Sequence, residues 1–90
     1  MSDKIIFSAS GMSDYISWQT EDKRTLKKIN QLINDIRRNG YTGIGSPEPL
    51  KGSQSGYWSR EIDKKNRIVY RVNNDGDIEI VQCRGHYGDK

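Results

Sequence analysis

The chain has 90 residues, so we expect one small domain spanning residues 1–90. Its single cysteine, Cys83, excludes a disulfide within the chain and argues against a secreted, disulfide-stapled scaffold. Fifteen Lys and Arg against 12 Asp and Glu leave a net charge of +3, a mild excess that favours an anionic partner such as nucleic acid or an acidic protein. The apolar run at 5–7 is too short for a signal peptide or a membrane span, so we expect a cytoplasmic protein without membrane contact.

The first 40 residues predict a strand followed by two helices. Residues 4–7 (KIIF) form a short apolar run typical of a buried strand. Residues 10–19 place serine and aspartate at helix-start positions, before apolar and aromatic residues, and predict a short helix in which Tyr15 and Trp18 serve packing.

The segment 20–38 has the clearest helical pattern. Its apolar residues recur at offsets of three and four and therefore lie on one face: Leu26, Ile29, Ile33 and Ile36. Thr20 or Asp22 can cap its start, and Asn-Gly at 39–40 ends it. We expect the two helices to form an antiparallel hairpin.

The second half of the chain predicts a loop and then an antiparallel meander. Residues 41–56 are rich in Gly, Pro and Ser and read as loop, with a short extended piece at 48–51. Three strands are expected at 57–62, 67–72 and 77–84, joined by hairpin turns at DKKN and NNDG. The order indicates an α+β fold, β-α-α-β-β-β with one further strand left open, with the helical hairpin packed on a mainly antiparallel sheet.

Most common motifs for metals and cofactors are missing from the sequence. It has no CxxC or HExxH and no acidic cluster with metal-ligand spacing, and GIGS at 43–46 lacks the lysine and the context of a phosphate-binding loop. Cys83 reads as a strand residue rather than a nucleophile. We therefore predict no metal and no cofactor.

Three other residues together suggest metal-free RNA cleavage. Glu48, Arg67 and His86 are each unremarkable alone: a loop carboxylate, a strand-edge cation and a residue near the chain end. Cleavage through a ribose 2′-OH requires a base, an acid and a cation for the charge that builds on phosphorus. Carboxylate, imidazole and guanidinium can fill these roles in turn, and arginine suits the last because its planar fork grips phosphate oxygens.

The motifs that carry these residues resemble the YoeB/Txe toxins of bacterial toxin–antitoxin systems, within the RelE/ParE superfamily. The resemblance runs from Asp14 to Tyr87 and includes DYISWQ, DKRTLKKINQLINDIRR, GIGSPEPLKG, SGYWSREID, NRIVYRV and the final HY. It implies a compact microbial-RNase-like fold. It also implies a ribosome-dependent endoribonuclease that cuts mRNA in the A site of the 70S ribosome and so inhibits translation. The expected partners are a YefM-type antitoxin, operator DNA through the antitoxin complex only, and, as an open alternative, a second copy of the chain.

The resemblance also implies residue roles. Glu48 of PEPLK matches the general base, His86 the general acid and Arg67 the phosphate-stabilising arginine. Lys51 matches a supporting cation, and Tyr87 matches a residue that positions the terminus or the nucleotide. Arg60 and Glu61 are also expected among the substrate-binding or supporting residues. The lysines of DKRTLKK are expected either to dock on ribosomal RNA phosphates or simply to form a solvated helix face.

The chain departs from the family pattern after WS. Relatives usually carry two arginines there, whereas this chain has Arg60 and then Glu61, so one charge in the cationic lining is reversed. Either Glu61 points elsewhere and costs little, or it repels the phosphate or pairs with Arg67 and attenuates the toxin. Gly85 before the histidine and GDK at 88–90 are lesser departures. The alternative function is an attenuated or non-catalytic toxin-fold protein, either ParE-like or an antitoxin-binding scaffold.

Overall fold

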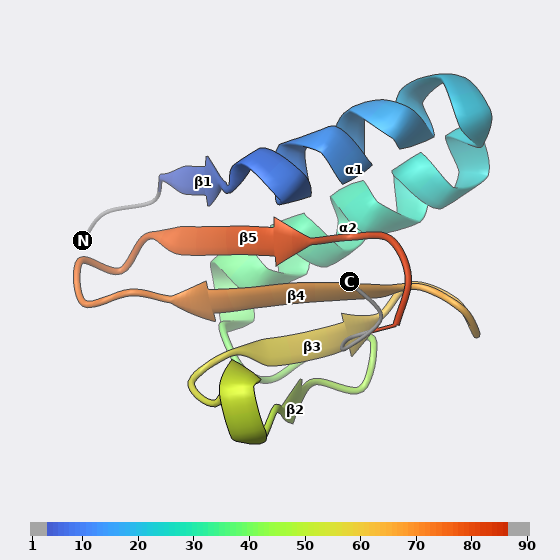
Figure 1. The fold of residues 1–90 in the computed structure, drawn as a ribbon. Helices are drawn as coiled ribbons and strands as arrows, with labels where there is room; N and C mark the ends of the chain where they lie inside the picture. The colour runs from blue at the N-terminus through green and yellow to red at the C-terminus, as the bar shows by residue number, and fades with distance from the viewer. Residues whose placement is uncertain (1–3, 87–90) are drawn as a thin grey trace.

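In the computed structural model, which describes residues 4–86, two helices cover one face of a five-stranded sheet (Figure 1). The α+β fold expected from the sequence is therefore confirmed. The elements, in chain order, are β1 (Ile5–Phe7), α1 (Ala9–Glu21), α2 (Lys23–Asn39), β2 (Glu48–Pro49), the 3₁₀ turn η1 (Gly52–Gln54), β3 (Trp58–Glu61), β4 (Arg67–Val72) and β5 (Ile78–Gln82).

The sheet has the strand order β1-β5-β4-β3-β2. Strands β2 to β5 pair antiparallel with their neighbours, as the two predicted hairpins require, and β1 joins β5 in parallel. Both hairpin turns are closed by side chains that accept backbone N–H groups: Asp63 in the β3–β4 turn and Asn73 in the β4–β5 turn. The two opposite edges of the sheet are thus β1 and the very short β2.

The two helices meet at a single residue. The N–H of Asp22 closes α1 on the carbonyl of Trp18, while its carboxylate accepts the N–H groups of Arg24 and Thr25 at the start of α2. One aspartate therefore ends one helix and caps the next, and of the two predicted caps it is Asp22 that is used. The helices consequently begin and end one to three residues away from the predicted boundaries 10–19 and 20–38.

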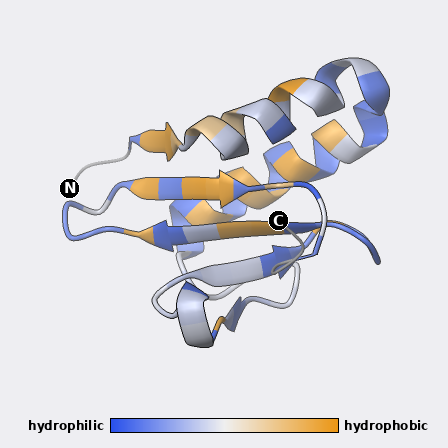
Figure 2. Cartoon of the chain, in the orientation of Figure 1, coloured by the Kyte–Doolittle hydropathy of each residue, from blue (hydrophilic) through white to orange (hydrophobic). Residues whose placement is uncertain are grey.

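The core lies between the helices and the sheet. The inner face of α2 buries Ile29, Leu32, Ile33 and Ile36 against β4 and β5. Figure 2 shows the corresponding apolar stripes on α2, β4 and β5. Each such side chain contributes about 1.5–3 kcal/mol when fully buried. Leu26, expected in the same stripe, is only partly buried at the margin of this core.

A second, smaller set of buried residues lies on the other face of the sheet. Among the described residues, Leu50 and Val69 are the buried apolar side chains that do not join the main core. The chain covers this face after β5, which ends at Gln82 instead of continuing to residue 84 as predicted. It ends there because the N–H of Cys83 turns away to the carboxylate of Asp14 in α1.

Within residues 4–86, no helix is long and apolar enough to cross a membrane.

Candidate active site

The strand register sets a row of side chains across the face of the sheet that the helices leave uncovered, which we call the helix-free face. Glu48 of β2 lies opposite Ser59 of β3, Ser59 opposite Val69 of β4, and Val69 opposite Gln82 of β5. Directly opposed residues point to the same side, and strand neighbours point to opposite sides. Arg60 contacts α2, so Ser59 and the rest of its row face away from the helices.

Glu48 is an exposed residue of a strand only two residues long. The N–H of Leu50 donates to the carbonyl of Tyr57 (2.9 Å), and hydrogen-bonded pairs alternate in an antiparallel ladder. Pro49 therefore occupies a position where the ladder needs no N–H. The two prolines around Glu48 restrict its backbone without costing a ladder hydrogen bond. Lys51 follows at the start of η1 and is exposed near Glu48 in the chain.

Arg67 begins β4 directly opposite Glu61 of β3, so both side chains also belong to the helix-free face. The nearest distance from an Arg67 guanidinium nitrogen to a Glu61 carboxylate oxygen is 4.0 Å. The same guanidinium nitrogen donates to the carbonyl of Asp63 at 2.8 Å. The guanidinium is therefore turned toward the β3–β4 turn rather than toward Glu48.

The Asp63 carboxylate keeps that turn in shape. Burial acts to raise the pKa of Asp63, but hydrogen bonds from Asn66 and from the N–H of Lys65 outweigh it and lower the pKa. The carbonyl that holds Arg67 thus belongs to a turn whose own carboxylate stays ionised.

The segment after β5 folds back and brings the backbone beside His86 to the start of β4. The carbonyl of Gly85 accepts the N–H of Arg67 (2.9 Å), and the N–H of Gly85 donates to Asn66 Oδ1 (2.7 Å). The side-chain amide of Gln82, which is buried, donates to the carbonyls of residues 84, 85 and 86 at 3.0, 3.3 and 3.1 Å. Figure 1 shows this segment turning back past the end of β3. We call Gln82, Asn66 and Gly85 the C-terminal clamp.

Gly85 is needed at its place in the clamp. Its φ of 81° lies in the left-handed region, which a residue with a Cβ adopts only at a cost. Gly85, which the resemblance marks as a departure from the family pattern, is therefore where the chain turns back toward β4.

Arg60 lies apart from the other sequence-predicted residues. It was expected among the substrate-binding or supporting residues, but its side chain is fully buried on the helix side of β3. It pairs with Asp35 of α2 and donates to Tyr70 Oη and to the carbonyls of Gly40, Thr42 and Ile44. The expectation is corrected: Arg60 fastens the loop that leads to Glu48 and does not line the surface beside it. Tyr87 lies outside the described residues.

The Asp35 carboxylate completes this buried contact. Hydrogen bonding from Arg60 lowers the pKa of Asp35, with further hydrogen bonds from the N–H of Ile44 and from Asn39 acting in the same direction. Burial raises the pKa of Tyr70, whose hydroxyl donates to the carbonyl of Gly40. The Asp35 carboxyl group therefore stays ionised and the Tyr70 hydroxyl stays protonated, and in these states both hold the loop.

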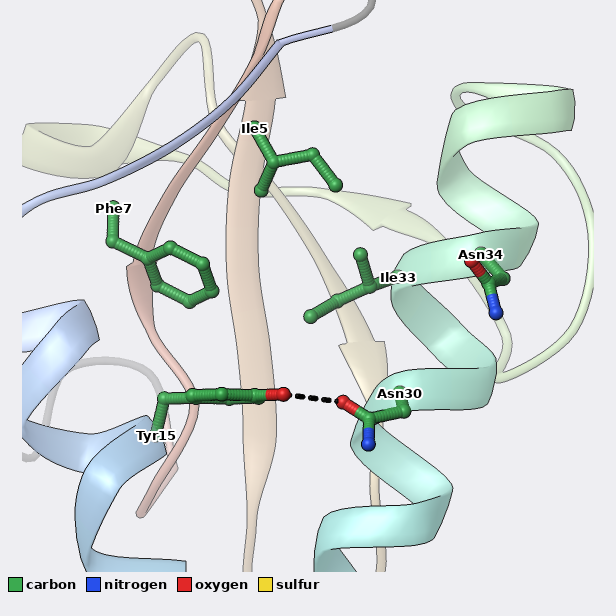
Figure 3. Close-up of a pocket in the computed structure, with 6 residues that line it drawn as sticks. All are labelled: Ile5, Phe7, Tyr15, Asn30, Ile33 and Asn34. Atoms are coloured by element: carbon green, nitrogen blue, oxygen red, sulfur yellow. Dashed lines mark hydrogen bonds between the residues drawn. The ribbon is translucent and has the colours of Figure 1, made fainter.

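A pocket of about 460 Å³ lies at the opposite edge of the sheet (Figure 3). It is lined by β1, α1 and α2, where Tyr15 donates a hydrogen bond to Asn30 at 2.7 Å. None of the residues predicted for catalysis contributes to it. In the part of the chain that the structure describes, no group of three or more His, Cys, Asp and Glu side chains is arranged to hold a metal ion.

Known proteins with similar sequences identify the family to which the chain belongs. Residues 7–87 match the family model for the YoeB-like toxin of bacterial type II toxin–antitoxin systems. The chain belongs to this family. A YoeB toxin from Escherichia coli K12 is 50% identical over 84 residues, which cover 93% of this chain and 99% of the relative.

Solved structures of YoeB toxins have the same fold. One from Agrobacterium tumefaciens superimposes with a TM-score of 0.90 at 47% identity and covers 93% of this chain and 99% of its own. A YoeB dimer from Staphylococcus aureus gives a TM-score of 0.85 at 46% identity, covering 93% and 97%. A heterotetrameric YoeB–YefM complex from the same organism gives 0.86 at 43% identity, covering 97% and 100%.

Three residues that shape this face were not predicted from the sequence to have a role in the site. Ser59 and Gln82 were treated as ordinary strand residues, and Asn66 as part of a hairpin turn. The polar residues Ser59 and Gln82 within apolar strands were the only available sign, and such residues are also common on solvated faces. Their contacts depend on tertiary packing.

Proposed function

We propose that this toxin is a ribosome-dependent mRNA endoribonuclease that cuts the message in the ribosomal A site by metal-free acid–base catalysis. The observation that carries the proposal is the register: Glu48 and Arg67 share the helix-free face, and the C-terminal clamp holds the backbone beside His86 against the start of β4. From strand spacing, the Cα atoms of Glu48 and Arg67 are roughly 12 Å apart, a span that one nucleotide can bridge between two long side chains.

The reaction assigns one step to each group. Glu48 accepts the proton of the ribose 2′-OH, and the 2′-oxygen attacks the adjacent phosphorus. Arg67 stabilises the charge on the phosphorane oxygens, supported by Lys51. The bond from phosphorus to the 5′-oxygen then breaks as His86, in its protonated form, gives its proton to that oxygen. The products are a 2′,3′-cyclic phosphate and a free 5′-OH.

Arg67 has to move for this reaction. Its guanidinium now donates to the carbonyl of Asp63 and faces Glu61. A phosphate that accepts two charge-assisted hydrogen bonds from the fork competes well with one neutral carbonyl. We therefore expect substrate binding to draw the guanidinium away from the β3–β4 turn.

The partners follow from the relatives. Since a YoeB from Staphylococcus aureus forms a heterotetramer with YefM, we propose a YefM-type antitoxin as the protein that holds this toxin inactive. We also propose that the chain contacts operator DNA only through that complex, and that it can form a homodimer as the relative does. The ribosomal partner is favoured by the basic start of α2, whose exposed side chains can bind RNA phosphates: Lys23, Arg24 and Lys27.

One observation favours the second candidate function, an attenuated or non-catalytic toxin-fold protein. Glu61 stands where relatives have a cation, and it lies 4.0 Å from the arginine that the reaction needs. A protein that acts only by binding, however, has no need of a base, an acid and a phosphate-binding cation on one face. We therefore rank catalysis first.

In vitro translation of a defined message, followed by primer extension, tests the proposal. We expect a cut at the A-site codon that disappears in Glu48→Ala and in His86→Ala. Glu79→Gln is the matched control, because Glu79 is a carboxylate of the same sheet in β5 and pairs with Arg71 away from the site. Arrest of translation with intact message would instead establish the binding protein.

A further inference from the structure

Ser59 carries a hydroxyl that the fold does not use. Within residues 4–86 its Oγ is the buried side-chain polar atom that has no hydrogen-bond partner, and the residue is 1% exposed. Such a group has lost its hydration without gaining a bond, which destabilises the fold. Alanine has nearly the same volume and would avoid this cost. The hydroxyl at this position therefore has to be explained by something other than folding.

The position of Ser59 limits what its hydroxyl can reach. It lies on the helix-free face between the apolar Val69 on one side and Glu48 on the other. In a hydrogen-bonded antiparallel pair the opposed Cα atoms are about 5.5 Å apart, which a carboxylate on a two-carbon stem spans. Rotation about the serine Cα–Cβ bond is enough to aim the hydroxyl at it. Glu48 is thus the acceptor that the register offers.

We propose that Ser59 is a positioning residue for Glu48: in the substrate-bound state its hydroxyl donates to the Glu48 carboxylate and holds the other carboxylate oxygen toward the ribose 2′-OH. The inference rests on the proposed function. Proline on both sides restricts the backbone of Glu48, but its own side-chain torsions are unrestrained by these prolines. A hydrogen bond from a residue fixed in the sheet restrains those torsions directly. The base then needs less reorganisation to accept the proton.

The proposal separates activity from stability. Loss of the Ser59 hydroxyl removes its hydrogen bond to the Glu48 carboxylate in the substrate-bound state. Because that bond is to a charged group, its loss should slow cleavage about tenfold to a hundredfold. Removing an unpartnered buried hydroxyl should leave thermal stability unchanged or raise it. A residue needed only for the fold would move both quantities in the same direction.

The experiment measures single-turnover cleavage by the toxin of a defined message bound to programmed ribosomes. The melting temperature of each variant is measured as well. For Ser59→Ala we expect a lower maximal rate, an unchanged half-saturating toxin concentration and an unchanged or higher melting temperature. Ser59→Thr keeps the hydroxyl and should cleave at close to the wild-type rate. Ser13→Ala, the same change on an exposed part of α1, is the control.

A double-mutant cycle tests whether Ser59 acts through Glu48. In a Glu48→Gln background, Ser59→Ala should cause no further loss, because the carboxylate that it orients is gone. An equal additional loss in that background would overturn the inference, as would a wild-type rate for Ser59→Ala or a fall in its melting temperature that matches its loss of rate. If the wild-type toxin itself leaves the message intact, the proposed function fails and this inference fails with it.

Discussion

Arg67 and Glu61 stand directly opposite each other in the β3–β4 ladder, 4.0 Å apart at their nearest charged atoms. The Glu61 side chain is 45% exposed and that of Arg67 is 19% exposed. Water therefore screens much of the attraction, which at this distance is about 1 kcal/mol in a fully aqueous setting. The pair weakens the positive field at the arginine without immobilising it.

Replacing Glu61 by arginine, the residue that the family resemblance leads us to expect there, should therefore increase the rate of cleavage. If the Glu61 charge disfavours the bound phosphate by a similar amount, about 1 kcal/mol, removing it gives about a fivefold gain, and Glu61→Gln should give part of it. The measurement is primer extension on translated message at matched toxin concentrations. Glu79→Gln breaks an equivalent cross-strand pair with Arg71 and controls for general effects on the sheet. Equal rates for all variants would show that Glu61 does not attenuate the toxin.

Arg67→Lys should be nearly as damaging as Arg67→Ala. Lysine keeps the charge but loses the planar fork that binds two phosphate oxygens at once. Loss of a group that stabilises charge in a transition state typically lowers the rate by about a hundredfold to a thousandfold. Single-turnover cleavage on programmed ribosomes measures this. Arg71→Lys, further along the same strand and on the same face, is the control and should cleave normally. A fully active Arg67→Lys would assign the phosphate to another cation.

Gln82→Ala should release the segment that carries His86. The amide of Gln82 donates to three consecutive carbonyls, the last of which is that of His86 itself. We expect faster hydrogen exchange at the Gly85 amide and about a tenfold lower rate of cleavage, since a displaced acid is an inefficient one. Gln31→Ala makes the same change on the exposed face of α2 and should alter neither quantity. Unchanged exchange at Gly85 would mean that the Asn66 contact is sufficient to hold the segment.

The contact between Asp35 and Arg60 should make the stability of the toxin dependent on pH in the acid range. Hydrogen bonding from Arg60 lowers the pKa of Asp35 below its ordinary value of 3.8. A carboxyl whose pKa is lower in the folded state stabilises the fold above its unfolded pKa, and that contribution disappears as the pH falls through the folded pKa. Wild type should thus lose stability below about pH 4 more steeply than Asp35→Asn.

Thermal unfolding between neutral pH and about pH 2.5 measures the difference. Asp35→Asn should melt lower than wild type at neutral pH, because Arg60 is then left buried without its charge partner, and the two curves should converge in acid. Asp75→Asn, an exposed residue of the β4–β5 turn, is the control. Parallel curves for wild type and Asp35→Asn would show that the contact is not linked to protonation.

The secondary structure could be predicted because its signals are local. Apolar spacing identified the inner face of α2, and apolar runs bounded by turn residues identified β4 at its observed ends, Arg67–Val72. The boundaries of the helices were less certain, since Thr20 and Asp22 were both chemically able to cap α2. The family could also be predicted, because the motifs around Glu48, Arg67 and His86 are contained in short segments of the sequence.

The neighbouring residues Arg60 and Glu61 show what remained for tertiary structure to decide. Adjacent residues of a strand must point to opposite faces, but the sequence does not say which face the helices cover. Packing of α2 against the sheet places Asp35 over Arg60 and so buries the arginine. That leaves Glu61 beside Arg67 on the helix-free face.

The sequence by itself therefore determined the elements, their order and the family, because these depend on periodicity and on motifs within short segments. Only the tertiary structure assigned Arg60 to the interior, fastened the backbone beside His86 through Gln82, and left the Ser59 hydroxyl buried opposite Glu48. Each of these depends on contacts between residues distant in sequence or on strand register, which local preferences do not specify.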